Sequence, residues 1–224
     1  MGLRVHRLEA WGLIVGPILA LAFFLLEPGA LIFDPAEFGD ADATVRAMAS
    51  NAAVAQLSAL MVPLGLILML YGLSGINRSI MGDSMAPALS RLGILFMTVG
   101  VFGWILASGL ALALAGTDLD SAREVEQAIA VYRVDSGIAI LSSMAVASGF
   151  LTFNLGLWAL FPQGLRRLVA LAVAAVSLFC LVALIIGHSA SDPTMITLAR
   201  LCYFPWVGWT AALGVGFLQG RELE

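Results

Sequence analysis

Six long apolar segments occupy most of this chain, and each is long enough to cross a lipid bilayer as a helix. A helix rises 1.5 Å per residue, so a hydrocarbon core about 30 Å thick takes roughly 20 residues to cross. The segments run approximately over residues 8–26, 57–76, 92–115, 137–161, 168–187 and 196–218. Only 12% of the residues are charged, whereas a soluble domain carries about 25%. The sequence therefore predicts an integral membrane protein.

The apolar segments are continuous rather than alternating, which favours helices over strands. A bilayer core offers no water to backbone polar groups, so spanning segments must be helices or closed barrels. We therefore predict an all-α fold, with residues 1–224 forming one bundle of six transmembrane helices. The first segment is longer than a signal-peptide core and lacks a small-residue cleavage site after it, so we expect it to be retained as a helix.

The connections between the segments alternate in charge. Seven of the eleven arginines fall on one side of the membrane, and eleven of the fifteen acidic residues fall on the other. We call these the arginine-rich side and the acidic side. The arginines of the first side are Arg4, Arg7, Arg78, Arg91, Arg166, Arg167 and Arg221. Because arginine-bearing loops stay in the cytoplasm, we expect both termini to be cytoplasmic.

The overall plan resembles that of many small six-helix bacterial membrane proteins. This resemblance implies a fold and a bacterial cytoplasmic membrane, but no activity. The net charge of −4 resides mostly in the loops of the acidic side. Such a surface argues against a nucleic-acid partner.

Helix-start signals predict short additional helices in the first and third connections. Residues 44–51 follow an acidic stretch, and Ser121 with Glu124 matches a capping box that would start a helix running past Tyr132. Each odd-numbered span follows an Arg-Leu pair, so the six spans are compatible with three repeated helical hairpins. Topology and capping rules alone would also produce this pattern, and the two interpretations remain open.

Small residues spaced four apart mark faces on which helices approach closely. Gly12 and Gly16 form one such pair in the first segment, and Gly208, Ala212 and Gly216 form a stripe in the last. Helices in lipid associate through small residues because little hydrophobic driving force exists between them. These positions predict tight seams, either inside the bundle, which we favour, or between subunits.

Polar residues near the acidic side point to a binding site, because a charge in lipid is costly unless it is paired. Arg200, Asp135 and Gln56 lie at similar depth, and we expect them to converge on an outward-facing polar pocket with Arg200 paired to Asp135 or Asp192. The alternative is that Arg200 extends to the lipid headgroups along its own aliphatic stem. Asn154 lies nearer the bilayer centre and is either a ligand-binding residue or an interhelical hydrogen-bonding group.

The sequence contains no recognisable catalytic or metal-binding constellation. His6 and His188 lie at opposite ends of their spans, so we expect no metal, haem or other cofactor. The absence of lysine excludes Schiff-base chemistry. Cys180 and Cys202 lie at the same depth and either form a disulfide or, as we favour, remain buried thiols.

The leading functional hypothesis is therefore a non-enzymatic accessory, scaffold or assembly subunit of a membrane complex. Its partners would be the lipid bilayer and either other membrane subunits or further copies of this chain. The second hypothesis is a carrier or binding protein for a small molecule or lipid, using the pocket around Arg200, Asp135 and Gln56. An enzyme ranks third.

Overall fold

The computed structural model describes residues 5–37, 39–80 and 82–220, and these residues form eight α-helices. Six helical stretches are long and apolar enough to span a membrane, which confirms the predicted all-α bundle. The helices are α1 (Arg7–Leu26), α2 (Ala41–Ser50), α3 (Ala52–Ser79), α4 (Met85–Leu114), α5 (Ala122–Leu160), α6 (Leu165–Ser189), α7 (Pro193–Leu201) and α8 (Tyr203–Leu218).

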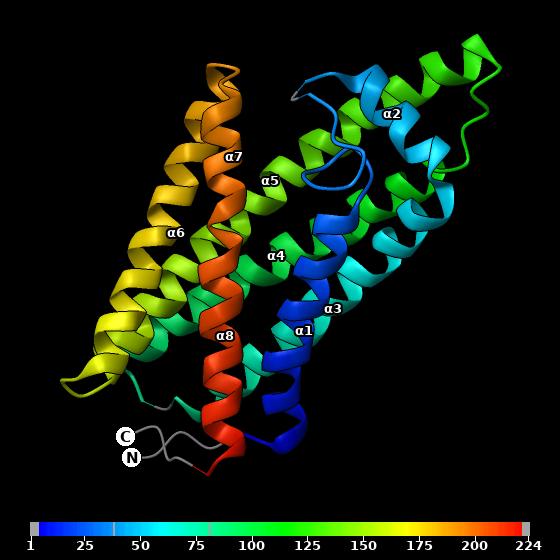
Figure 1. Ribbon diagram of the computed structural model, residues 1–224. Helices are drawn as coiled ribbons and strands as arrows, with labels where there is room; N and C mark the ends of the chain where they lie inside the picture. The colour runs from blue at the N-terminus through cyan, green and yellow to red at the C-terminus, as the bar shows by residue number, and fades with distance from the viewer. Residues whose placement is uncertain (1–4, 38, 81, 221–224) are drawn as a thin grey trace.

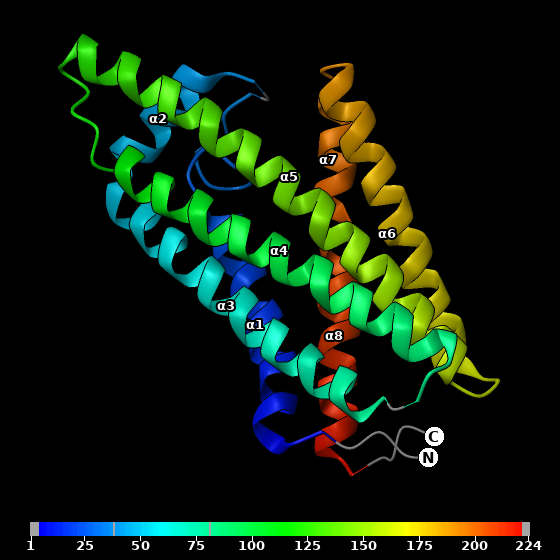
Figure 2. The ribbon, with the colours of Figure 1, turned by 180° about the vertical axis from the view of Figure 1, so that it is seen from behind.

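The spans follow one another around a ring (Figures 1 and 2). Helix α1 packs on α3, α3 on α4, α4 on α5 and α5 on α6, and the last span completes the ring through α7 on α6 and α8 on α1. Helix α1 begins and α8 ends at the same end of the bundle (Figure 1). This is the arginine-rich end, although Arg4 and Arg221 lie outside the described residues. Helix α2 lies at the opposite, acidic end.

The expected short helix in the third connection is not separate from the fourth span. Helix α5 runs without a break for 39 residues, which is about 58 Å at the standard rise. Neither glycine nor proline occurs between Ala122 and Ser136, so nothing interrupts the backbone hydrogen bonds there. The Ser121 side chain caps the helix by accepting from the Glu124 N–H at 3.4 Å. The Glu124 carboxylate instead accepts from the Asp118 N–H, so only half of the predicted capping box forms.

Helix α2 is the expected short helix of the first connection. Asp40 caps it by accepting a hydrogen bond from the Ala43 N–H at 2.9 Å. Its buried residues Val45 and Met48 pack in a small core with Leu114 and Ala128. Helix α2 is thereby held against α5 at the acidic end of the bundle.

The sixth span was predicted as one helix but is interrupted at Cys202. Pro205 has no N–H to donate to the Leu201 carbonyl, so the helical hydrogen-bonding pattern is interrupted between α7 and α8. Helix α7 packs on α6, where Ile196 fills the space that a side chain at Gly187 would need. Helix α8 packs on α1, where Gly214 allows close approach to the Ala10 carbonyl. The interruption therefore lets one span follow two different neighbours.

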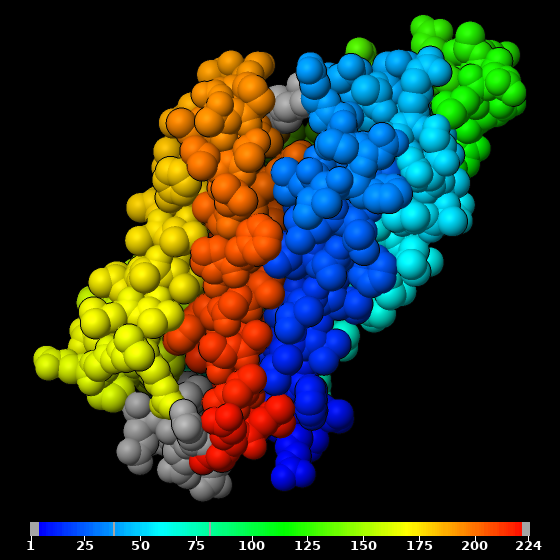
Figure 3. Space-filling model, viewed as in Figure 1, coloured from blue at the N-terminus to red at the C-terminus, as the bar shows by residue number. Residues whose placement is uncertain are grey.

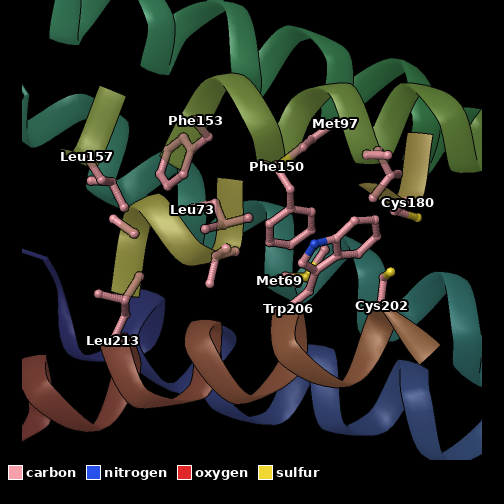
Figure 4. Close-up of a cluster of buried hydrophobic side chains, with 14 of the residues drawn as sticks. Met69, Leu73, Met97, Phe150, Phe153, Leu157, Cys180, Cys202, Trp206 and Leu213 are labelled. Atoms are coloured by element: carbon pink, nitrogen blue, oxygen red, sulfur yellow. The ribbon is translucent and has the colours of Figure 1, made fainter. Parts of the chain in front are cut away.

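Aromatic residues fill the centre of the bundle (Figure 4). The rings of Phe150 and Trp206 stack with their centroids 4.7 Å apart. The Trp206 indole N–H donates to Ser177 Oγ at 2.9 Å, so its polar atom is satisfied in the core. Trp206 is therefore a packing residue that joins α8 to α5 and α6.

An ion pair between a buried glutamate and an exposed arginine joins two helices at the arginine-rich end. Glu9 of α1 is only 5% exposed, and its carboxylate accepts from Arg78 of α3 and from the His6 N–H. Gly75 leaves the space that this carboxylate occupies. The pair joins the first two spans, because a buried charge is stable only when it is paired and hydrogen-bonded.

Candidate functional site

Three adjoining cavities extend from the acidic end of the bundle toward its centre. The largest, the outer cleft, has a volume of about 780 Å³ and is lined by residues that include Asp40, Tyr132, His188 and Arg200. Figure 3 shows a notch at this end between α7 and the segment that leads into α2. The outer cleft exists because α7 follows α6 and therefore lies apart from α2 at this end.

An inner polar cavity of about 120 Å³ adjoins the outer cleft, and it brings together two acidic side chains and one arginine. Glu27 follows α1 and donates its backbone N–H to the Phe24 carbonyl. Asp135 belongs to α5, and Arg200 to the last turn of α7. Arg200 therefore lines both the outer cleft and the inner polar cavity, whereas the two carboxylates line only the latter.

The opposite charges of the inner polar cavity do not touch. Among the described residues, no Arg200 nitrogen lies within 4.0 Å of a carboxylate oxygen. The predicted pairing of Arg200 with Asp135 or Asp192 is therefore not formed. The Asp192 carboxylate is used elsewhere, because it caps α7 by accepting from the Thr194 N–H at 2.8 Å. The guanidinium and the two carboxyl groups therefore line one cavity without forming an ion pair.

Two buried polar atoms of this cavity have no hydrogen-bond partner among the described residues: Ser58 Oγ and Asp135 Oδ1. Ser58 belongs to α3 and is completely buried. Buried polar groups in proteins are almost always hydrogen-bonded, so each such orphan calls for an explanation. Both orphans belong to residues that line the same cavity, so a polar group placed in this cavity would be able to satisfy them.

Burial raises the pKa of Glu27 from its ordinary value of 4.5 to about 7. The nearby negative charge of Asp135 raises this pKa further, and the positive charge of Arg200 partly opposes the rise. Desolvation is the largest cause of the raised pKa, and it acts by disfavouring the charged form of the carboxyl group. Glu27 therefore changes its charge near neutral pH.

A third cavity, the apolar annex, has a volume of about 70 Å³ and lies next to the inner polar cavity. Phe24 and Trp104 line all three cavities, and their rings meet edge to face at 6.2 Å. The Tyr203 ring contacts Phe24 at 5.5 Å, and its hydroxyl donates to Ser143 Oγ. On a scale where one water needs about 10–15 Å³, this annex accommodates a short apolar group.

The predicted binding residues are only partly brought together. Arg200 and Asp135 line one cavity. Gln56 is exposed on α3 and lines none of the cavities described above, whereas Ser58, two residues further on, lines the inner polar cavity. Asn154 lies in the core, where it accepts from the Trp209 indole N–H at 2.7 Å and donates to a backbone carbonyl. It serves as an interhelical hydrogen-bonding group.

The small-residue positions divide into two kinds. Gly12 and Gly16 face α3 so closely that an added side chain would meet the backbone around Leu68. At Gly208, by contrast, nothing lies within 4 Å of an added Cβ. Gly208, Ala212 and Gly216 instead line a groove of about 630 Å³ between α6 and α8 at the arginine-rich end. The face of α8 that packs on α1 is the one that carries Gly214.

The histidines and cysteines do not gather into a reactive centre. His6 begins α1 at the arginine-rich end, while His188 lines the outer cleft at the acidic end. Cys180 and Cys202 are free buried thiols, and the Cys180 thiol donates to the Ala199 carbonyl at 3.5 Å. Across the described part of the chain, no group of three or more His, Cys, Asp or Glu residues is arranged to hold a metal ion.

Comparisons with protein-family models, with curated proteins and with solved structures gave no match to this chain.

Proposed function

We propose that this membrane protein binds a small ligand that enters from the acidic side and occupies the inner polar cavity. The observation that carries the proposal is the pair of buried, unpartnered atoms, Ser58 Oγ and Asp135 Oδ1, on the wall of one cavity. A ligand with polar groups would satisfy both. The outer cleft supplies its route, and the protein acts as a binding protein or a carrier.

The architecture suits such a role because rigid helices hold the site. Three different helices supply the polar residues of the site: α3 carries Ser58, α5 carries Asp135 and α7 carries Arg200. The ring of spans surrounds these residues. Ligand sites in helical membrane proteins form in the same way, where polar side chains face the interior of the bundle.

Filling the cavity tests this proposal. Ala139 lines both the outer cleft and the inner polar cavity, so Ala139→Trp should occlude them. Val134 lies on the same helix with 58% of its surface exposed, so Val134→Trp is the matched control. The measurement is the thermal unfolding midpoint Tm of the detergent-purified protein with a panel of amines, carboxylates, amino acids and phospholipids, together with mass spectrometry of retained molecules.

At least one compound should raise the Tm of the unmodified protein and of Val134→Trp, but not that of Ala139→Trp. A ligand at 100 times its Kd stabilises by about 2.7 kcal/mol, which corresponds to roughly 5–10 °C in a chain of this size. The proposal is wrong if no compound has this effect and no molecule is retained preferentially by the unmodified protein.

An accessory-subunit role is the second candidate, and one observation favours it. Gly208, Ala212 and Gly216 line a groove on α8 instead of an internal seam, and such stripes let a second helix approach closely. Gly208→Ile would then release a co-purifying subunit or change the oligomeric state. An unchanged particle mass would argue against this role.

A further inference from the structure

We infer that the ligand of the inner polar cavity is a zwitterionic amphiphile. Its ammonium group lies against Glu27 and Asp135, its acidic group lies against Arg200, and a short apolar group enters the apolar annex. This inference rests on the proposed function, because it specifies the chemistry of the molecule bound in the same cavity.

The separated charges of the cavity are the first part of the argument. Two carboxylates and one guanidinium share a cavity of about 120 Å³, yet no guanidinium nitrogen lies within 4.0 Å of a carboxylate oxygen among the described residues. Partly buried charges of opposite sign that stay apart are costly unless something else compensates them. A molecule that carries one charge of each sign compensates both sides at once.

The hydrogen-bonding groups that line the cavity suit such a ligand. Asp135 Oδ1 is a buried acceptor without a partner, and an ammonium group offers three donors. Arg200 presents a planar set of donors suited to a carboxylate or a phosphate. Ser58 Oγ, also without a partner, either donates or accepts. A simple cation would leave Arg200 without a partner, and a simple anion would leave Asp135 Oδ1 without a donor.

Aromatic rings link the charged and apolar regions. Phe24 and Trp104 line the inner polar cavity and the apolar annex alike. The faces of aromatic rings attract ammonium groups, and their bodies pack against apolar groups. The annex, at about 70 Å³, suits an apolar group of a few carbon atoms. The shared chemistry occurs both in apolar α-amino acids and in the headgroup region of phosphatidylethanolamine.

Three probes with one carbon skeleton separate the possible ligand classes. Leucine carries both charges, isoamylamine is leucine without its carboxylate, and isocaproate is leucine without its ammonium. Calorimetric titration of the purified full-length protein should show leucine binding at least 10-fold more tightly than either analogue. For the lipid source, nanodiscs of phosphatidylethanolamine are compared with nanodiscs of phosphatidylcholine, whose quaternary ammonium has no N–H donor.

Two substitutions assign the ends of the ligand. Arg200→Gln should weaken leucine binding about 10- to 100-fold, in line with one charge-assisted contact, and leave isoamylamine binding unchanged. Asp135→Asn should weaken leucine and isoamylamine but leave isocaproate unchanged. Arg123→Gln, an exposed change of the same charge on α5, serves as the control. The Tm of each variant shows that it is folded.

The outcomes separate the inference from the proposed function. Selective binding of leucine supports the inference and identifies an amino acid as the source. Retention of phosphatidylethanolamine over phosphatidylcholine supports it too and identifies a lipid as the source, provided that Asp135→Asn abolishes this retention. Occupancy of the cavity by a singly charged or uncharged compound, blocked by Ala139→Trp, overturns the ligand class and leaves the proposed function standing. Absence of any ligand blocked by Ala139→Trp overturns both.

Discussion

At the scale of single residues, Glu27 makes the stability of the protein depend on pH. Its pKa is about 7 in the folded protein against an ordinary 4.5, so the folded state keeps a proton that the unfolded chain has released. Stability from this group is therefore complete below about pH 4.5 and is lost as the pH rises through 7. The effect is at most on the order of 3 kcal/mol, at about 1.4 kcal/mol for each pKa unit.

Glu27→Gln, which mimics the protonated carboxyl group, should remove this dependence. Tm measured between pH 5 and 8 should fall more steeply for the unmodified protein than for Glu27→Gln, and the two curves should diverge at the alkaline end. Glu37→Gln in the same connection is the control. Parallel curves for all three proteins would show that Glu27 is solvated.

Sequence reasoning can single out residues that stand out within an apolar segment. Arg200 and Asp135 are conspicuous because charges are rare there, and the structure places them in one cavity. Glu27 was not recognised, because an acid at the end of an apolar segment looks like a solvated loop residue. Its partial burial depends on the connection that folds back at Gly29, whose N–H donates to the Asp34 carbonyl. A serine such as Ser58 carries no distinguishing sequence signal.

At the scale of helices, the seam between α1 and α3 depends on glycine. A Cβ at Gly65 would lie 2.6 Å from the Gly16 carbonyl oxygen and 2.6 Å from the Ala20 nitrogen. Both are backbone atoms, so the helices must separate. Gly65→Ala should therefore destabilise by about 1–3 kcal/mol, which lowers Tm by roughly 2–12 °C.

Gly208→Ala is the matched control for this substitution, because an added Cβ there meets nothing within 4 Å. Alanine is the better helix former, so Tm should stay the same or rise slightly. Both variants are compared by circular dichroism in one detergent. An equal fall in Tm for the two variants would mean that glycine affects stability through backbone flexibility and not through the close approach of two helices.

The existence of the spans was predictable, but their boundaries and breaks were less so. Hydropathy detects where an apolar segment begins and ends. The C-terminal end of each predicted span lies within a few residues of the observed helix end. Hydropathy does not show that α5 continues past the apolar region, because the residues from Ala122 to Tyr132 form an equally good amphipathic helix. Pro205 marked the break in the sixth span, yet proline is common enough in spanning helices that its position alone is not decisive.

At the scale of the whole molecule, the charge distribution predicts how the protein lies in the membrane. We expect the arginine-rich end to face the cytoplasm and the acidic end, with its cleft, to face outward. Exposed residues in connections at the two ends allow a direct test. Asp120→Cys places a thiol at the acidic end, and Ser84→Cys places one at the arginine-rich end.

A membrane-impermeant maleimide should label Asp120→Cys in intact cells and Ser84→Cys only after the membrane is opened. The unmodified protein controls for background, because Cys180 and Cys202 are both buried. Labelling in the reverse order would place the cleft on the cytoplasmic side. The ligand proposed above would then come from inside the cell.

The interruption at Cys202 also bears on how the chain enters the membrane during synthesis. Helix α8 has 16 residues, about 24 Å, which is less than the hydrocarbon thickness of about 30 Å. Helix α7 completes the crossing but brings Arg200 with it, and the two together form the least hydrophobic of the six spans, whereas α6 is the most hydrophobic. We therefore expect the last span to leave the insertion machinery together with α6, on which α7 packs.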